Sequence, residues 1–264
     1  MKSYKKLPIL LLILFFYNPL FAGQQYERSA IIFAAGNLKF VFPKIIEEFY
    51  AKYPTATVHI QYGSSGDLAD AIINENRNYD IFFSADTDYP AQVYATNKSE
   101  TKPKKYARGI LILVTPHNPL LQKERIRALK NKNIPYITIA NKSFAPYGKA
   151  TLEALKNSKY YENLKNKIRY SSDVATVINN VTWEGDAGFL SKSVVHMLPK
   201  GHNRRGYDWI EVNKNLYHPI IQAYVISKEG LKNNNAMQFL KFLESSQGQK
   251  ILRDYGYTNI TPDE

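Results

Sequence analysis

Short apolar stretches alternate with helical segments along this chain, and this alternation limits the folds that it can adopt. Residues 31–34 are typical of a buried strand, and apolar residues then recur at helical spacing over residues 38–53. Residues 58–62 are a second candidate strand, and the turn at 63–66 leads into another helix. Strand, turn and helix repeated in this order predict a parallel sheet covered by helices.

The same order begins again in the middle of the chain. Residues 109–114 form a continuous apolar strand, residues 136–140 form another, and a helical segment follows the turn at 146–148. A chain of 264 residues is also longer than one compact core usually requires. We therefore expect an α/β fold with two lobes, each a mostly parallel sheet flanked by helices.

The N-terminus has the three-part pattern of a secretory signal. Three lysines precede the apolar run 7–17, and Ala22 is a small residue at the expected cleavage position. The run is shorter than the ~20 residues that span a bilayer, which disfavours an uncleaved anchor. Removal of residues 1–22 leaves 242 residues and lowers the formal net charge from +12 to +9. The sequence thus predicts an exported, periplasmic protein.

Composition excludes several classes of site. The chain has no cysteine, so it cannot form a disulfide, a thiolate zinc site, a cysteine-ligated iron–sulfur cluster or a cysteine nucleophile. Its basic residues are scattered and accompany no nucleic-acid-binding signature, so nucleic acid is not an expected partner. The five histidines show no spacing typical of a metal-ligand pair on one helix.

The search for catalytic motifs is also negative. No phosphate-binding P-loop, zinc-protease helix or dinucleotide-binding glycine pattern is present. The turn at 63–66 fails the Gly-x-Ser-x-Gly pattern, because Asp67 stands where the second glycine is required. The sequence therefore predicts neither an enzyme nor a bound cofactor.

Small hydrogen-bond donors gather instead at four turns that lead from strands into helices. Asn37, Ser64 with Ser65, the turn 146–148 and the segment 172–174 each stand at the start of a probable helix. The first N–H groups of a helix have no partner within it and lie at the positive end of its dipole. Several such turns around one crevice would hold an anion.

The same segments carry a resemblance to a known family. The motifs are Phe33-Ala34-Ala35-Gly36-Asn37-Leu38, Tyr62-Gly63-Ser64-Ser65-Gly66-Asp67-Leu68, Asp80-Ile81-Phe82-Phe83-Ser84-Ala85-Asp86 and Arg253-Asp254-Tyr255-Gly256-Tyr257. They resemble successive motifs of the periplasmic molybdate-binding proteins of ABC importers. The resemblance implies a type II periplasmic-binding fold with the ligand in the hinge cleft. It also implies two crossings between lobes, with one lobe formed by 23–107 plus 223–264 and the other by 108–222.

The resemblance further implies which residues hold the ligand. The family's two ligand serines fall on Asn37 and Ser65, and its main-chain donors fall on Tyr147 and Val174. Its tyrosine hydroxyl falls on Ser191, a shorter side chain that reaches less far. Neutral N–H and O–H donors suit a deprotonated tetrahedral dianion, which offers only acceptors. No protein atom is expected to coordinate the molybdenum or tungsten directly.

The implied function is capture of molybdate or tungstate by a monomeric receptor and delivery to the membrane permease of an ABC importer. Two other classes stay open. A receptor for sulfate, phosphate or an organic acid would place an arginine in the cleft. An exported serine hydrolase would use Ser65 with a nearby histidine or lysine as its base.

Overall fold

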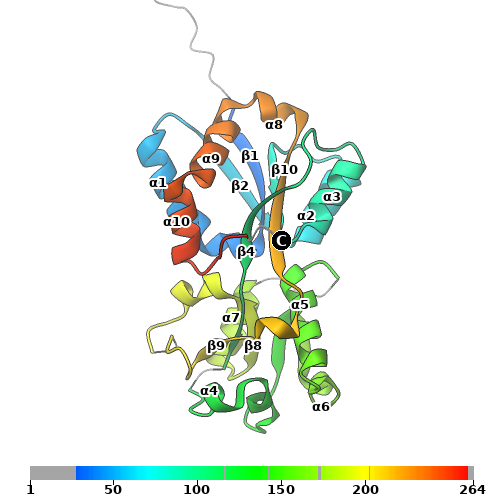
Figure 1. The fold of residues 1–264 in the computed structure, drawn as a ribbon, viewed down its shortest axis with the longest axis vertical. Coiled ribbons are helices and arrows are strands. Elements are labelled where there is room, and N and C mark those ends of the chain that lie inside the picture. The colour runs from blue at the N-terminus through cyan, green and yellow to red at the C-terminus, as the bar shows by residue number, and fades with distance from the viewer. Residues whose placement is uncertain (1–27, 116, 142, 172–173, 202, 261–264) are drawn as a thin grey trace, which may run out of the picture.

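The computed structural model describes residues 28–115, 117–141, 143–171, 174–201 and 203–260. The predicted signal segment, residues 1–22, therefore lies outside the described residues. The described chain forms two lobes stacked along the long axis of the molecule (Figure 1), each built on a five-stranded sheet. Within the described ranges, no helix combines the length and apolar character needed to cross a membrane.

The first sheet belongs to the lobe that contains the start and the end of the described chain. Its strands lie in the order β2 (Val58–Gly63), β1 (Ala30–Ala35), β3 (Ile81–Phe83), β10 (Ile220–Ile226) and β4 (Lys104–Gly109). β1 pairs in parallel with β2 and β3, whereas β10 pairs antiparallel with β3 and β4.

The second sheet repeats this plan. Its strands lie in the order β7 (Ile168–Ser171), β6 (Ile137–Ala140), β8 (Ala187–Ser191), β5 (Leu111–Val114) and β9 (Trp209–Glu211). β6 pairs in parallel with β7 and β8, whereas β5 pairs antiparallel with β8 and β9.

We expected mostly parallel sheets, and the observed pairings show that both sheets are mixed. In each sheet four strands run one way and one strand, β10 or β5, runs the other way. β5 and β10 are the strands that enter their sheets from the other lobe. Parallel neighbours need a crossover connection, usually a helix, and no such crossover precedes either of these two strands. The reversed strand in each lobe therefore marks where the chain changes lobes.

The first crossing corrects one expectation about a strand. Residues 109–114 were expected to form a single strand, but β4 ends at Gly109 and β5 begins at Leu111. β4 belongs to the first sheet and β5 to the second, so this prediction was wrong. The apolar run consists of the buried strand β5 and the two residues before it, Gly109 and Ile110, and sequence pattern alone cannot show that Gly109 belongs to a different sheet. The second crossing lies between Glu211 and Ile220.

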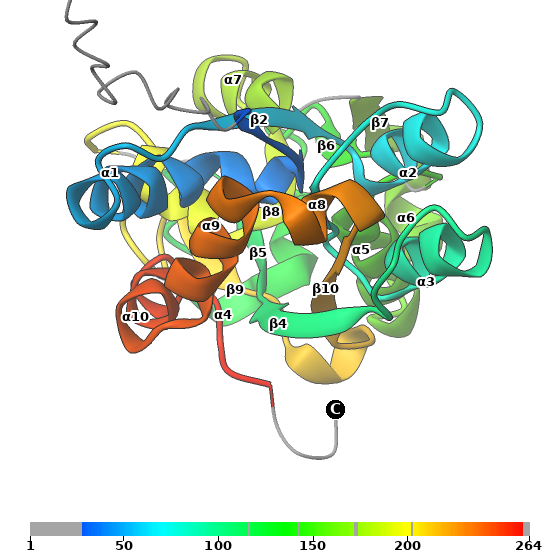
Figure 2. The same cartoon turned by 90° about the horizontal axis from the view of Figure 1, so that it is seen from above.

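Helices cover both faces of the first sheet (Figure 2). They are the 3₁₀ helix η2 (Gly36–Phe40) and the α-helices α1 (Phe42–Lys52), α2 (Ser65–Ile73), α3 (Asp88–Ala95), α8 (Lys228–Lys232), α9 (Asn234–Glu244) and α10 (Ser246–Asp254). Val41 lies between η2 and α1, and Pro43 lies in the first turn of α1, where the N–H that proline lacks would have no partner within the helix.

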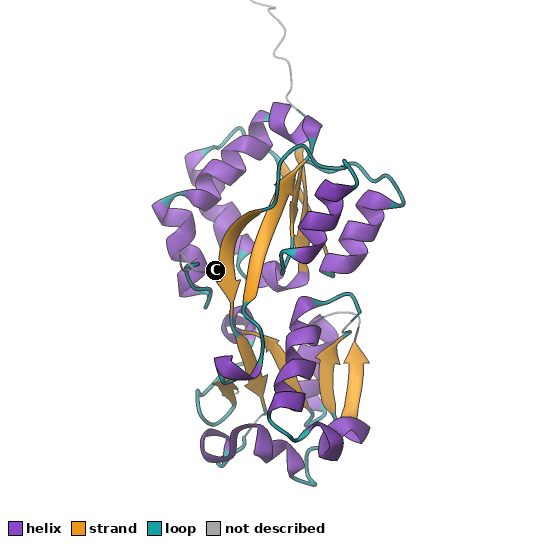
Figure 3. Ribbon diagram, turned by 45° about the vertical axis from the view of Figure 1, so that its right-hand side comes forward, coloured by secondary structure: helices purple, strands orange, loops and turns teal. Residues whose placement is uncertain are grey.

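The second sheet is flanked in the same way (Figure 3). Its α-helices are α4 (Leu121–Glu124), α5 (Pro146–Asn157), α6 (Tyr161–Leu164) and α7 (Val174–Trp183). Its 3₁₀ helices are η3 (Arg125–Lys130), η4 (Lys165–Lys167), η5 (Lys192–Met197) and η6 (Lys214–Leu216).

The two lobes bury cores of different character. In the first lobe, Phe42 packs edge-on against Phe83 and Phe239, with ring centroids 5.5 and 5.6 Å apart. The largest core cluster of the second lobe is mainly aliphatic, with Leu111 and Ile137 fully buried in it. Each lobe therefore has a largely separate hydrophobic core, and Phe40 of the first lobe packs in a cluster of the second lobe where the two meet.

Candidate ligand-binding site

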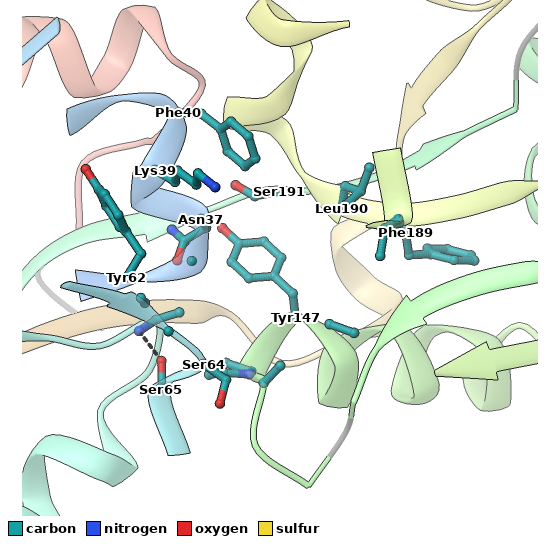
Figure 4. Close-up of a pocket in the computed structure, with 18 residues that line it drawn as sticks. Asn37, Lys39, Phe40, Tyr62, Ser64, Ser65, Tyr147, Phe189, Leu190 and Ser191 are labelled. Carbon is teal, nitrogen blue, oxygen red and sulfur yellow. Dashed lines mark hydrogen bonds between the residues drawn. The ribbon is translucent and has the colours of Figure 1, made fainter. Parts of the chain in front are cut away.

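A cavity of about 180 Å³ lies where the two lobes meet (Figure 4). Its walls come from both sheets, at the residues that end strands β1, β2, β6 and β8 or directly follow them. In open α/β sheets, ligands bind at the carboxyl ends of strands. This cavity is therefore the candidate site, and we refer to it as the interlobe pocket.

Four of the five residues expected to hold the ligand line the interlobe pocket: Asn37, Ser65, Tyr147 and Ser191. The fifth, Val174, is the first residue of α7, whose Val177 lines the pocket. The side chain of Val174 lies outside the described part of the structure. Whether these residues contact a ligand stays a prediction, but the fold brings four of them to one cavity from both lobes.

Ser65 offers a hydroxyl group whose oxygen is held in place by the backbone. Its side chain is buried, and its Oγ accepts a hydrogen bond of 3.0 Å from the Ala85 N–H (Figure 4). An oxygen that accepts from the protein keeps its own hydrogen for another acceptor. The Ser65 hydroxyl can therefore donate to a ligand in the pocket.

The two main-chain N–H groups that follow Ser65 at the start of α2 are already used. The Gly66 N–H donates to the Phe144 carbonyl of the opposite lobe at 2.9 Å, and the Asp67 N–H donates to Ser64 Oγ at 3.2 Å. The N–H groups of Gly66 and Asp67 are therefore not available to an anion, whereas the hydroxyls of Ser64 and Ser65 each accept a hydrogen bond and keep their own hydrogen. The Gly66 contact also ties the two lobes together beside the pocket.

Asn37 presents a different chemistry from the one expected. Its Nδ2 donates to Gln222 Oε1 at 3.1 Å and to the Tyr257 hydroxyl at 2.8 Å, which uses both amide hydrogens. Its Oδ1 is buried and has no hydrogen-bond partner among the described residues. In this arrangement the side chain leaves an acceptor unpaired, whereas the sequence suggested a free donor.

The phenol group of Tyr147 lies beside β4 and β10, the two strands of the first sheet that adjoin the crossings between the lobes. Its hydroxyl accepts from Gln222 Nε2 at 3.2 Å, and its ring tip lies directly against Gly109 of β4. A side chain at position 109 would collide with that hydroxyl, so glycine is required there by close approach. Burial raises the pKa of Tyr147 well above its ordinary value, and burial also raises the pKa of Tyr257 to about 12. Both phenols therefore stay neutral.

The backbone of Tyr147 remains a candidate donor. It is the second residue of the twelve-residue helix α5, after Pro146, and the first N–H groups of a helix have no partner within it. Tyr147 lines the interlobe pocket. The position therefore fits the main-chain contact that the sequence suggested.

Ser191 ends β8 and takes part in a chain of hydroxyl groups that joins the lobes. Its Oγ lies 2.9 Å from Ser193 Oγ, and Ser193 Oγ donates to the Asn37 carbonyl at 3.0 Å. Because the Ser193 hydrogen points to Asn37, the Ser191 hydroxyl is the donor in the serine pair. Its hydrogen is then used within the protein.

The charge in the pocket is positive. Of the residues described as lining it, Lys39 is the one with a charged side chain, and no aspartate, glutamate, arginine or histidine is among them. Among the described lining residues there is no arginine of the kind expected for a receptor of a different anion. Of the two bases expected for a hydrolase, no histidine lines this described pocket, whereas a lysine, Lys39, does. This composition suits a small anion held mainly by neutral groups.

Sequence reasoning missed Lys39, Ser193, Gln222 and Tyr257 as parts of the site. Gln222 is a polar residue within the apolar strand β10 and is fully buried, which is a signal that can be found in a sequence. Tyr257 was noted in the C-terminal motif, but its contact with Asn37 was not foreseen. Such a contact requires the fold.

Comparison with known proteins gives the family. The family model described as bacterial extracellular solute-binding protein matches residues 30–258. The chain belongs to this family. Export from the cytoplasm, which the sequence predicted, agrees with a family of extracellular receptors.

Relatives of this solute-binding protein include the molybdate-binding protein of Rhodobacter capsulatus. The two are 28% identical over 232 residues, which cover 86% of this chain and 87% of the relative. A putative ABC transporter substrate-binding lipoprotein of Bacillus subtilis strain 168 is 23% identical over 244 residues, covering 89% of this chain and 88% of that protein.

Solved structures confirm the two-lobed periplasmic-binding fold. The periplasmic molybdate-binding protein of Azotobacter vinelandii matches with a TM-score of 0.76 and 24% identity, covering 88% of this chain and all of that one. The sulfate-binding protein of Mycobacterium tuberculosis H37Rv matches with a TM-score of 0.66 and 14% identity, covering 90% and 88%. Neighbours that bind different anions share this fold, so the ligand must be argued from the pocket.

Proposed function

We propose that this solute-binding protein captures molybdate or tungstate in the interlobe pocket and delivers it to the membrane permease of an ABC importer. The observation that carries the proposal is the Ser65 hydroxyl, whose oxygen accepts from the Ala85 N–H and which lines a cavity with no carboxylate among its described lining residues. A dianion that offers only acceptors is satisfied by such donors and would be repelled by a carboxylate. The name of the relative from Rhodobacter capsulatus supports the same ligand.

The proposed ligand contacts are Asn37, Ser65, Tyr147, Val174 and Ser191. Ser65 donates through its hydroxyl, and Tyr147 and Val174 donate through their main-chain N–H groups at the starts of α5 and α7. At Asn37 an anion competes with Gln222 and Tyr257 for the amide hydrogens. Ser191 closes the pocket from the second lobe.

Further parts of the proposal concern the whole protein. Residues 1–22 are a signal peptide that is cleaved on export to the periplasm. The mature chain is a monomer, acts as a receptor and not as an enzyme, and does not bind nucleic acid. Its lobes comprise 23–107 plus 223–264 and 108–222, with boundaries close to the two positions where the chain passes from one sheet to the other.

A second candidate ligand is an oxyanion that carries a proton, such as hydrogen phosphate. The unpaired, buried Oδ1 of Asn37 favours it, because a protonated oxygen can donate to that acceptor whereas molybdate cannot.

A thermal-shift panel tests the proposal. Molybdate, tungstate, sulfate, phosphate and chromate are each added to the mature protein, and binding is then measured by calorimetry for every anion that raises the unfolding temperature. A ligand at 100 times its dissociation constant adds roughly 2.7 kcal/mol to the free energy of unfolding. We expect shifts with molybdate and tungstate. A shift with phosphate alone would support the second candidate, and no shift with molybdate or tungstate would refute the first.

A further inference from the structure

Lys39 stands out in the interlobe pocket because of its charge. It lies on η2, the short helix that also carries Asn37, and its side chain is exposed. None of the ion pairs found between described residues includes it. A cation in this position has no carboxylate in the pocket to neutralise it.

The direction of the side chain places its charge over the cavity. Figure 4 shows Lys39 extending alongside Asn37, with its nitrogen pointing to the side of the pocket that Ser191 forms. Ser191 is a short residue whose hydroxyl is bonded to Ser193 at 2.9 Å. The Ser191 hydroxyl is therefore not a free donor on this side of the pocket.

We infer that Lys39 is a ligand contact that supplies the positive charge of the pocket and determines its preference for dianions. The inference rests on the proposed function and deepens it. A hydrogen bond between an ammonium group and an anion is roughly twice as strong as one between neutral groups. The long flexible stem of lysine lets the ammonium follow an anion into the cavity as the lobes enclose it. Neutral donors fix the geometry of the ligand, and Lys39 balances part of its charge.

Lys44 offers a matched control. It lies five residues further along on α1 and is paired with Glu47 and Glu48 at 2.9 and 2.8 Å. Lys44→Gln changes the net charge of the protein by the same amount as Lys39→Gln. Only the Lys39 substitution removes a charge from the pocket.

The experiment measures the dissociation constant of molybdate by calorimetry at low and high sodium chloride for the wild type, Lys39→Gln, Lys39→Arg and Lys44→Gln. We expect Lys39→Gln to bind about tenfold more weakly at low salt and to lose much of the salt dependence of the wild type. Lys39→Arg keeps the charge and should stay within about threefold of the wild type. Lys44→Gln should behave as the wild type.

The outcomes separate the two proposals. A wild type that binds molybdate, with Lys39→Gln binding equally well and with the same salt dependence, overturns the role of Lys39 and leaves the proposed function standing. A wild type that binds neither molybdate nor tungstate overturns the proposed function, and this inference with it. Because Lys39 is exposed, we expect the Lys39 variants to unfold at the wild-type temperature when no ligand is present. This measurement distinguishes a loss of binding from a loss of folding.

Discussion

The two walls of the interlobe pocket are built from similar turns but present different chemistry. On the wall of the first lobe, Ser65 accepts from the Ala85 N–H and keeps its hydrogen free. On the wall of the second lobe, Ser191 passes its hydrogen to Ser193, which donates in turn to Asn37. Ser65, which follows β2, and Ser191, which ends β8, thus have different hydrogen-bonding capacity. The difference shows that the partner of a hydroxyl group determines whether its hydrogen is available to a ligand.

This contrast assigns the two lobes different tasks. The first lobe carries the free hydroxyl of Ser65 and the charge of Lys39, so it can recognise an anion before the lobes enclose it. The second lobe contributes the apolar residues Phe189 and Leu190, the phenol of Tyr147, whose oxygen accepts from Gln222 Nε2, and the proposed main-chain donors of Tyr147 and Val174. We expect its apolar residues to exclude water from the ligand and so to strengthen the hydrogen bonds that the ligand makes.

The largest effect on affinity is expected at Ser65. Ser65→Ala removes the free donor and should weaken molybdate binding by about 1–3 kcal/mol, the range for a hydrogen bond to a charged group. It also leaves the Ala85 N–H without its acceptor, so some stability is lost as well. Calorimetric titration and chemical denaturation measure the two effects separately.

A control for that stability loss is Ser245→Ala. Ser245 caps α10 by accepting from the Gly248 N–H at 3.2 Å, and its removal should cost about 1 kcal/mol of stability. It does not line the interlobe pocket, so affinity should be unchanged. Unchanged affinity in Ser65→Ala as well would remove Ser65 from the site and would erase the contrast between the two walls.

The positions of the pocket residues could be predicted from the sequence because local patterns determine them. Glycine, serine and proline at strand-to-helix turns mark Asn37, Ser65 and Tyr147 before any contact is known. The hydrogen bonds of those residues could not be predicted. Asn37 is bonded to Gln222 and Tyr257, which follow it by 185 and 220 residues. Partners so distant in the chain meet only because β10 and the C-terminal segment return to the first lobe.

The same limit explains the errors about strands. Apolar runs show that a segment is buried but not which sheet contains it, so residues 109–114 were joined although Ile110 separates two lobes. The direction of a strand depends on the connection that precedes it, which apolar runs do not show. Each sheet therefore contains one reversed strand, β10 or β5, that the sequence did not indicate. Lys39 was counted with the general positive charge of the chain, since only the fold shows that it faces the cavity.

An intermediate effect, on stability rather than affinity, is expected at Tyr147. Tyr147→Phe removes the hydroxyl that accepts from Gln222 Nε2 at 3.2 Å and leaves a buried donor unpaired. The free energy of unfolding should fall by about 1–2 kcal/mol, whereas affinity should change little because the proposed contact is the main-chain N–H. Tyr170→Phe, at an exposed tyrosine on β7, is the matched control and should alter neither quantity. A tenfold loss of affinity at unchanged stability would instead identify the phenol as a ligand contact.

The smallest effect is expected at Ser191, and it tests the contrast most directly. Because its hydrogen is bonded to Ser193 at 2.9 Å, a ligand gains little from this hydroxyl unless that bond is broken. Ser191→Ala should therefore weaken molybdate binding by only about threefold, at the low end of the range for a neutral hydrogen bond. Titrating Ser65→Ala and Ser191→Ala under the same conditions compares the two walls. If Ser191→Ala costs as much affinity as Ser65→Ala, then the serine pair rearranges on binding and both lobes donate to the anion.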